Sequence, residues 1–288
     1  MMNDNPADCP SSSSCGLEVE NLTKLYPPVR KGLVGFRDLV DTLKGRREEV
    51  LALKDISFGV RGGEWFGLLG PNGSGKTTLC NIILDTTTPT SGHVLYDGFD
   101  VNREHEKIQG RICTMQYQFL LQRVNVRDSL RRAGAEWMLP REEIEERMNW
   151  LVDIFDMREK LDDWLVRLSS GMFRKVMMIA TLMSGAELLV FDEPTQGMDV
   201  FTRKKLYQQL HHFQRDSGTT VFWTTHNLHE AEETCDRIAV IDNHLVTVTT
   251  PKKLVQEMEK ANLEEAFISL LRGNKTQTRG ASKGTGSE

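Results

Sequence analysis

The 288-residue chain lacks features that would place it in several other classes of protein. It has no run of eighteen apolar residues, so no segment is expected to span a membrane. Its formal net charge of −5 gives no support for nucleic acid as the main partner. The five cysteines are odd in number and lack metal-ligand spacing, and the serine-rich leader lacks the apolar core of a secretory signal. These absences favour a protein of the reducing cytosol.

A glycine-rich stretch at 70–78 is the most informative part of the chain. It fits the P-loop template and lies between an apolar segment at 64–69, interpreted as a strand, and a helix predicted over 79–84. Glycines let the backbone wrap phosphate oxygens, and the N–H groups at the start of a helix point at the anion. The predicted phosphate-binding residues are Gly70, Pro71, Asn72, Gly73, Ser74, Gly75, Lys76, Thr77 and Thr78. Lys76 is expected to reach the β- and γ-phosphates, and the Thr77 hydroxyl to hold Mg²⁺.

Two carboxylates follow a second apolar segment, at 188–191. This segment reads as a strand buried on both faces of a parallel sheet, and open α/β sheets bind ligands at the carboxyl ends of their strands. Asp192 is therefore expected to make a second contact to Mg²⁺. Glu193 is expected to orient and deprotonate the attacking water. Together with the P-loop, the pair predicts hydrolysis of a nucleoside triphosphate.

Three further signals are weak when taken singly. Leu-Ser-Ser-Gly-Met at 168–172 precedes a helix predicted over 173–183, and such a helix start can bind an anion. His226 follows an apolar strand predicted over 219–223, and Gln116 follows another predicted strand. A lone His or Gln at a strand end is most often structural.

In this order and spacing, the five signals resemble the nucleotide-binding subunit of ABC transporters. The resemblance extends over about 17–273 and includes Asp-Glu-Pro-Thr-Gln-Gly-Met-Asp at 192–199. It implies a head-to-tail pair of subunits, most simply a homodimer, with two ATP molecules between them. Each ATP is expected to lie between the P-loop of one subunit and the signature loop (residues 168–172) of the other. The implied signature contacts come from Ser169, Ser170 and Gly171.

The resemblance also assigns roles to single residues. Tyr26 matches the aromatic residue that stacks on adenine. Gln116 is implied to sense Mg²⁺ and the membrane partner, Asp199 to communicate across the dimer, and His226 to contact the γ-phosphate. The predicted catalytic residues are therefore Lys76, Gln116, Glu193 and His226.

The implied fold is α/β, a P-loop NTPase (RecA-like) core with an antiparallel β subdomain and an inserted α-helical subdomain. The predicted organisation is a disordered leader at 1–16, an ABC ATPase domain at 17–273 and a disordered tail at 274–288. The helical insertion is placed at about 125–182. Its apolar residues at helical spacing are expected to form core, and they are Ile144, Met148, Leu151, Val152 and Phe155.

A basic amphipathic segment at about 30–47 is an addition to the minimal domain. The segment contains six basic and two acidic residues, and four of its apolar residues are spaced to form one stripe on a helix. One interpretation is an arm that contacts the membrane surface or the permease. The other is a surface helix that packs on its own domain, and the sequence leaves both open.

The chain departs from the family pattern at four positions. Ser170 replaces the usual Gly and Met172 the frequent Gln of the signature loop, while Met198 and Val200 replace a usual Leu and Pro. None of these changes removes a charged or metal-binding group, so a working ATPase is expected. A Cβ at Ser170 would distort the loop if that residue needed a positive φ.

The predicted function is ATP binding and hydrolysis that powers transport through a separate multi-span permease. Segments 225–237 and 262–270 resemble the branch paired with drug or polysaccharide exporters of the ABC-2 type, which favours export. The alternatives are the ATPase subunit of an importer or a soluble ABC-type ATPase without a transport role. ATP and Mg²⁺ are the expected cofactors, and no nucleic acid partner is expected. The expected location is cytoplasmic, on the inner face of the membrane through the permease.

Overall fold

A computed structural model describes residues 15–27, 49–115 and 124–281 of the chain. Its centre is a six-stranded sheet in the order β10-β9-β3-β8-β7-β6. The β9–β10 pair is antiparallel, whereas the other neighbouring strands run parallel. The strands are β3 (Trp65–Leu69), β6 (Ile112–Thr114), β7 (Leu188–Asp192), β8 (Thr220–Thr225), β9 (Arg237–Ile241) and β10 (Leu245–Thr249).

The two faces of this sheet are buried in two hydrophobic clusters. On β3, Trp65 and Leu69 belong to one cluster and Phe66 and Leu68 to the other, because successive side chains of a strand point to opposite faces. All five residues of β3 are buried. Burying one such side chain contributes about 1.5–3 kcal/mol relative to leaving it exposed. The sheet that carries the P-loop is therefore covered on both sides, as the continuous apolar segments predict.

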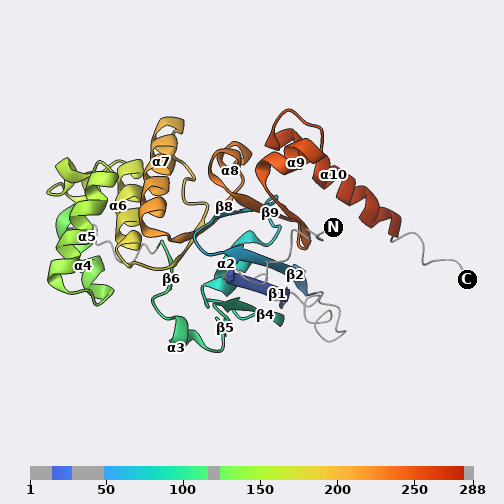
Figure 1. The fold of residues 1–288 in the computed structure, drawn as a ribbon, viewed down its shortest axis with the longest axis horizontal. Coiled ribbons are helices and arrows are strands. Elements are labelled where there is room, and N and C mark those ends of the chain that lie inside the picture. The colour runs from blue at the N-terminus through green and yellow to red at the C-terminus, as the bar shows by residue number, and fades with distance from the viewer. Residues whose placement is uncertain (1–14, 28–48, 116–123, 282–288) are drawn as a thin grey trace, which may run out of the picture.

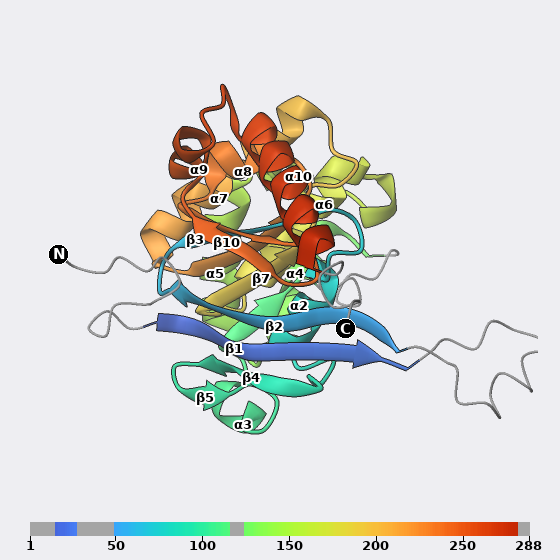
Figure 2. The ribbon, with the colours of Figure 1, turned by 90° about the vertical axis from the view of Figure 1, so that its right-hand side faces the viewer.

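A second, antiparallel sheet lies against one face of the central sheet (Figure 2). Its order is β2-β1-β4-β5, and its strands are β1 (Cys15–Tyr26), β2 (Val50–Arg61), β4 (Ser91–Tyr96) and β5 (Phe99–Asp100). Phe58 of β2 stacks on Phe66 and Phe222 of the central sheet, with ring centroids 5.4 and 6.5 Å apart. The structure thus has the antiparallel β subdomain that the resemblance implies.

Helices pack around both sheets (Figure 1). They are α2 (Lys76–Ile83), α3 (His105–Ile108), α4 (Val126–Glu136), α5 (Arg141–Ile154), α6 (Ser170–Leu182), α7 (Val200–Ser217), α8 (Leu228–Thr234), α9 (Pro251–Glu257) and α10 (Leu263–Ala281). Two 3-10 turns, η2 (Arg158–Lys160) and η3 (Leu165–Arg167), join α5 to α6. Across the described ranges, none of these helices is both long and apolar enough to cross a membrane.

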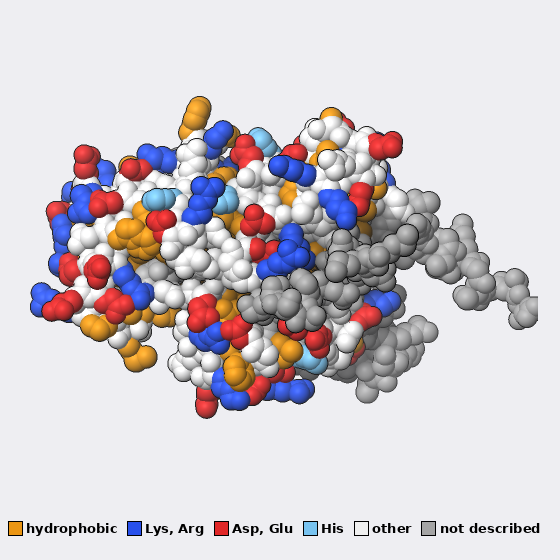
Figure 3. Space-filling view, in the orientation of Figure 1, with side chains coloured by type: hydrophobic (Ala, Val, Ile, Leu, Met, Phe, Trp, Pro, Cys, Tyr) orange, Lys and Arg blue, Asp and Glu red, His pale blue; other side chains and the backbone are white. Residues whose placement is uncertain are grey.

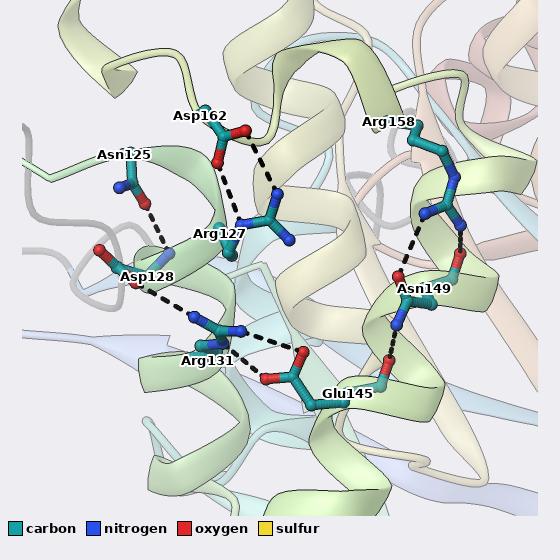
Figure 4. Close-up of polar contacts among 8 residues, drawn as sticks. All are labelled: Asn125, Arg127, Asp128, Arg131, Glu145, Asn149, Arg158 and Asp162. Carbon is teal, nitrogen blue, oxygen red and sulfur yellow. Dashed lines mark hydrogen bonds and ion pairs between the residues drawn. The ribbon is translucent and has the colours of Figure 1, made fainter.

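Helices α4, α5 and α6 form the helical insertion, at the left of Figure 1. Its predicted apolar stripe is buried. On its surface, Arg131 contacts Glu145 at 2.5 Å and Asp128 at 3.6 Å, and Arg127 contacts Asp162 at 3.1 Å (Figure 4). Acidic and basic side chains alternate over this end of the molecule (Figure 3). Exposed ion pairs contribute about 0–1 kcal/mol each, so the buried stripe supplies most of the stability of the insertion.

Several element bounds differ from the sequence-based expectation. The helix after the P-loop begins at Lys76, three residues before the predicted start. β1 begins at Cys15, inside the predicted leader, and α10 continues to Ala281, inside the predicted tail. Lys, Gln, Arg and Thr permit a helix, and a single Gly costs only about 1 kcal/mol, so composition alone did not mark the end of α10. The basic segment at 30–47 lies outside the described residues.

Candidate active site

The P-loop connects β3 to α2. Gly75 is the N-cap of α2, with a φ of 102°, which glycine adopts without steric strain. A Cβ on Gly75 would overlap the Leu53 side chain and lie 2.6 Å from the carbonyl oxygen of Ala52. A Cβ on Gly70 would overlap the carbonyl oxygen of Ile241. Both glycines are therefore required by close backbone approach.

Two polar side chains inside the P-loop are buried. The Lys76 ammonium donates to the carbonyl oxygens of Gly70 and Pro71, at 2.8 and 3.2 Å. Burial lowers the pKa of Lys76, while the carboxylates of Glu193 and Asp192 oppose this shift. The Ser74 hydroxyl is buried and has no hydrogen-bond partner within the described residues. Because buried polar groups are nearly always paired, this hydroxyl is available to donate to an anionic ligand held by the loop.

A cleft of about 360 Å³ lies over the loop. Its lining residues are Tyr26, Val50, Leu51, Ala52, Asn72, Gly73, Gly75, Lys76, Thr77, Thr78 and Glu193. The Tyr26 hydroxyl lies 3.5 Å from the Thr78 hydroxyl, and the Lys24 ammonium lies 4.9 Å from the centre of the Tyr26 ring. The cleft thus joins phosphate-binding backbone, one aromatic ring and one carboxylate, which suits a nucleotide.

Asp192 and Glu193 are held by Thr224 of the neighbouring strand. The Thr224 hydroxyl donates to Asp192 Oδ1 at 2.5 Å. The backbone N–H of Glu193 donates to the carbonyl and the hydroxyl oxygen of Thr224, at 3.2 and 3.1 Å. Glu193 has a φ of 47°, the left-handed conformation that is uncommon for a residue with a Cβ. These bonds hold the turn that directs the Glu193 side chain into the cleft.

His226 lies beside Glu193. Its Nδ1 is 3.1 Å from Glu193 Oε2. The two residues directly follow the adjacent parallel strands β7 and β8, which are paired in register. A carboxylate at this distance fixes the orientation of the imidazole ring. The predicted pair of Glu193 and His226 is thus brought together by the sheet.

The signature loop lies close to the first turn of α7, the helix that Asp199 caps, and neither segment lines the cleft. The Ser169 hydroxyl accepts from the N–H of Met172 at 3.2 Å and caps α6. Asp199 caps α7 by accepting from the N–H of Thr202 at 3.0 Å, and the bonds from Thr202 lower its pKa. A Cβ on Gly171 would lie 3.2 Å from the Thr202 methyl carbon. No cleft-lining residue comes from either segment within the described part of the chain.

The signature loop has no strained residue at position 170. Ser170 is the first residue of α6 and is not among the residues with positive φ. The condition under which its Cβ would distort the loop, a positive φ, is therefore not met. The helix starts three residues earlier than predicted because the Ser169 side chain provides the N-cap. Gln116 lies outside the described residues, so its proposed role stays a prediction.

The residues near the P-loop fit Mg²⁺ held jointly with a nucleotide. Thr77 lines the cleft, and the Asp192 carboxylate has one oxygen, Oδ2, left over from its bond to Thr224. No group of three or more His, Cys, Asp or Glu side chains that could hold a metal occurs in the described ranges. Mg²⁺ is commonly bound by one or two carboxylates together with substrate phosphates. A hydroxyl, one carboxylate and a triphosphate match that preference.

Sequence reasoning missed Thr224 as a functional residue. A threonine in an apolar strand resembles an ordinary strand former, and no local pattern marks it. Its role depends on β8 lying next to β7, which is a property of strand order. The polar Thr224 and Thr225 also extend β8 two residues beyond the predicted strand end.

Comparison with known proteins gives a family match. A family model described as ABC transporter matches residues 53–196, half of the chain. Nod factor export ATP-binding protein I of Ralstonia nicotianae is 35% identical over 71% of this chain and 64% of its own length. The protein of the same name from Rhizobium sp. strain N33 is 32% identical over 75% and 72%. Linearmycin resistance ATP-binding protein LnrL of Bacillus subtilis is 30% identical over 76% and 74%. The match thus covers less than two thirds of the length of the Ralstonia relative.

Solved structures share the fold. A chain described as the ATP binding subunit of an ABC transporter is 24% identical with a TM-score of 0.70, over 88% of this chain and 99% of its own. An ATP-binding cassette described as dimeric, in a post-hydrolysis state bound to ADP and Pi, is 22% identical with a TM-score of 0.64. The latter covers 81% of this chain and 98% of its own.

Proposed function

Because the chain belongs to the ABC transporter family and carries its ATPase domain, we propose that it is the ATP-hydrolysing subunit of a transporter with a separate membrane permease. The fold and the family resemblance predicted from the sequence are confirmed by these matches. The observation that carries the proposal is the meeting of the P-loop, Asp192, Glu193 and His226 at one edge of the central sheet.

The proposed chemistry assigns one task to each side chain. Glu193 accepts the proton of the attacking water, and His226 is held beside it to contact the γ-phosphate. Lys76 and the N–H groups of the loop stabilise the charge that develops on the phosphate oxygens. Thr77, Asp192 and Gln116 would hold Mg²⁺, which would neutralise further phosphate charge when bound.

A second copy of the chain is the proposed partner in the hydrolytic unit. The cleft of one chain lacks signature residues, although the signature loop offers a capped helix N-terminus suited to an anion. Val200 and Phe201, next to Asp199, are 71% and 89% exposed. An exposed apolar pair beside these two segments supports burial against another subunit. The head-to-tail arrangement would complete each ATP site with Ser169, Ser170 and Gly171 of the other copy.

Export is the proposed direction of transport. The relatives described above are named for Nod factor export and linearmycin resistance. A subunit of this kind would be attached to the inner face of the membrane through its permease. The basic segment at 30–47 is a candidate contact with that permease or with the lipid surface.

ATP hydrolysis by the Glu193→Gln variant tests the catalytic assignment. We expect kcat to fall by about 10²-fold or more, because loss of a general base typically costs 10²–10⁴. Glu146→Gln is the matched control, since it makes the same change on an exposed side chain of α5. It is expected to keep wild-type turnover. Unchanged turnover in Glu193→Gln would contradict the proposed mechanism.

Copurification tests the proposed partner and direction. Glu193→Gln is expressed with its native membranes, extracted in mild detergent with ATP, and analysed by mass spectrometry. Recovery of a multi-span permease without a solute-binding protein is the expected result for an exporter. A solute-binding protein in the same complex would indicate import. Recovery of ribosomal proteins in place of a permease would refute the transport role and leave the ATPase role intact.

A further inference from the structure

Glu230 is a buried carboxylate that the proposed chemistry does not use. It lies in the first turn of α8 and is 3% exposed. Its Oε1 accepts from the hydroxyls of Thr195, at 2.8 Å, and Tyr207, and its Oε2 accepts from the hydroxyl of Thr225 at 2.5 Å. These three donors come from the turn after β7, from α7 and from the end of β8. One side chain therefore joins three separate segments.

The three donors adjoin the proposed catalytic residues. Thr195 is two residues after Glu193, and Thr225 immediately precedes His226. The two oxygens of Glu230 thus hold the two segments whose side chains meet at 3.1 Å in the cleft. Through Tyr207, the same carboxylate also holds α7, the helix that Asp199 caps.

The hydrogen bonds around Glu230 suit a carboxylate. A carboxylate only accepts, and three hydroxyl groups each donate one proton to it. The Thr225 oxygen accepts from the N–H of Asn227 at 3.0 Å, which leaves its own proton for Glu230. Burial raises the pKa of Glu230, and the carboxylate of Glu193 adds to this, whereas the Thr195 bond and the charge of Arg203 lower it. A donor left unpaired in this buried network would lose its hydrogen bond without compensation from water.

We propose that Glu230 is a positioning residue for ATP hydrolysis, which fixes the segment of Glu193 to the segment of His226. The proposal rests on the proposed function, because it takes these two residues as the hydrolytic pair. Glu230 does not line the cleft and acts through Thr195 and Thr225. Its loss should disturb the hydrolytic pair and leave the P-loop and Tyr26, which lie on other elements, in place.

Steady-state ATP hydrolysis by Glu230→Gln separates positioning from general structural damage. The amide keeps the shape of the side chain but replaces one accepting oxygen by an NH₂ group, so at least one of the three hydroxyls loses its acceptor. We expect kcat to fall about tenfold or more while KM for ATP stays within about twofold. Glu233→Gln, an exposed change on the same helix, is the matched control and should leave both constants unchanged.

A double-mutant cycle with Thr225→Val identifies the bond responsible. If Glu230 acts through Thr225, the loss of kcat from Thr225→Val should be at least threefold smaller in the Glu230→Gln background. If Glu230→Gln fails to fold, Tyr207→Phe removes one donor and should lower kcat several-fold at constant KM. A parallel loss of kcat, apparent ATP affinity and melting temperature would overturn the proposal in favour of a purely structural role.

Glu193→Gln, measured alongside, separates the two proposals. Wild-type kcat in Glu230→Gln together with an inactive Glu193→Gln would overturn the positioning role and keep the proposed function. Full turnover in Glu193→Gln would overturn the proposed function and, with it, the positioning role.

Discussion

The unpartnered hydroxyl of Ser74 predicts opposite effects of one substitution on the free and the ATP-bound protein. Ser74 is 1% exposed, and its hydroxyl has no hydrogen-bond partner within the described residues. In the free protein, no side chain or backbone group of the described residues compensates for the burial of this hydroxyl. In the complex, the triphosphate would supply a charged acceptor. Ser74→Ala should therefore stabilise the free chain and weaken ATP binding.

The size of both effects follows from the cost of an unmade hydrogen bond. An unsatisfied buried hydroxyl costs about 1–3 kcal/mol, so Ser74→Ala should raise the free energy of unfolding by about 1 kcal/mol or more. For a chain of this size, 1 kcal/mol corresponds to a shift of about 2–4 °C in melting temperature. A hydrogen bond to a charged group contributes about 1.5–3 kcal/mol, which predicts ATP binding weaker by about tenfold or more.

Thermal unfolding with and without ATP measures both effects on one sample. Ser129→Ala is a matched control, because Ser129 of α4 also has a buried hydroxyl without a partner but lies in the helical insertion. Both variants should melt above the wild type without ATP, and only Ser74→Ala should show a smaller increase when ATP is added. A lower melting temperature for free Ser74→Ala, or an unchanged ATP effect, would refute the reasoning.

Three further predictions concern single residues. Gly75→Ala should abolish detectable ATP binding in titration calorimetry, because its Cβ would lie 2.6 Å from the Ala52 carbonyl oxygen in a left-handed backbone conformation; near-normal affinity would contradict the geometry of the loop. Met148→Ala in the fully buried stripe of α5 should cost about 2–5 kcal/mol in urea unfolding, and a loss below about 1 kcal/mol would mean that the insertion repacks. Burial raises the pKa of Glu230 from 4.5 to about 7, so the native state holds a proton that the unfolded chain has released between these values. The free energy of unfolding should therefore fall as pH rises from about 4.5 to about 7, and Glu230→Gln, unlike wild type, should lack this part of the slope.

The sequence predicted what depends on local pattern. The P-loop was recognisable because its glycines, Lys76 and Thr77 have fixed spacing inside a strand–loop–helix unit. The buried strands and the apolar stripe of α5 were recognisable from continuous or periodic apolar residues. The two carboxylates at the end of β7 were predicted because they come directly after one of these continuous apolar segments.

What the sequence could not show depends on which strands are neighbours. Thr224 supports Asp192 only because β8 lies beside β7, and Glu230 joins three segments that belong to different elements. The left-handed backbone conformation of Glu193 could not be predicted, because the residue there is not a glycine or an asparagine. Helix starts were predicted too late, at α2 and α6, because the capping residues Gly75 and Ser169 lie before the apolar pattern begins.

The position of β3 in the central sheet has a consequence for folding during synthesis on the ribosome. β3 ends at Leu69, but both strands that pair with it, β8 and β9, begin only at Thr220 and Arg237. At a synthesis rate of about 5–20 residues per second, this apolar strand waits on the order of ten seconds for its partners. Nascent chains that end before Thr220 should therefore need chaperone protection and bind no nucleotide. The P-loop is synthesised early, but it can bind a nucleotide only after most of the chain has been synthesised.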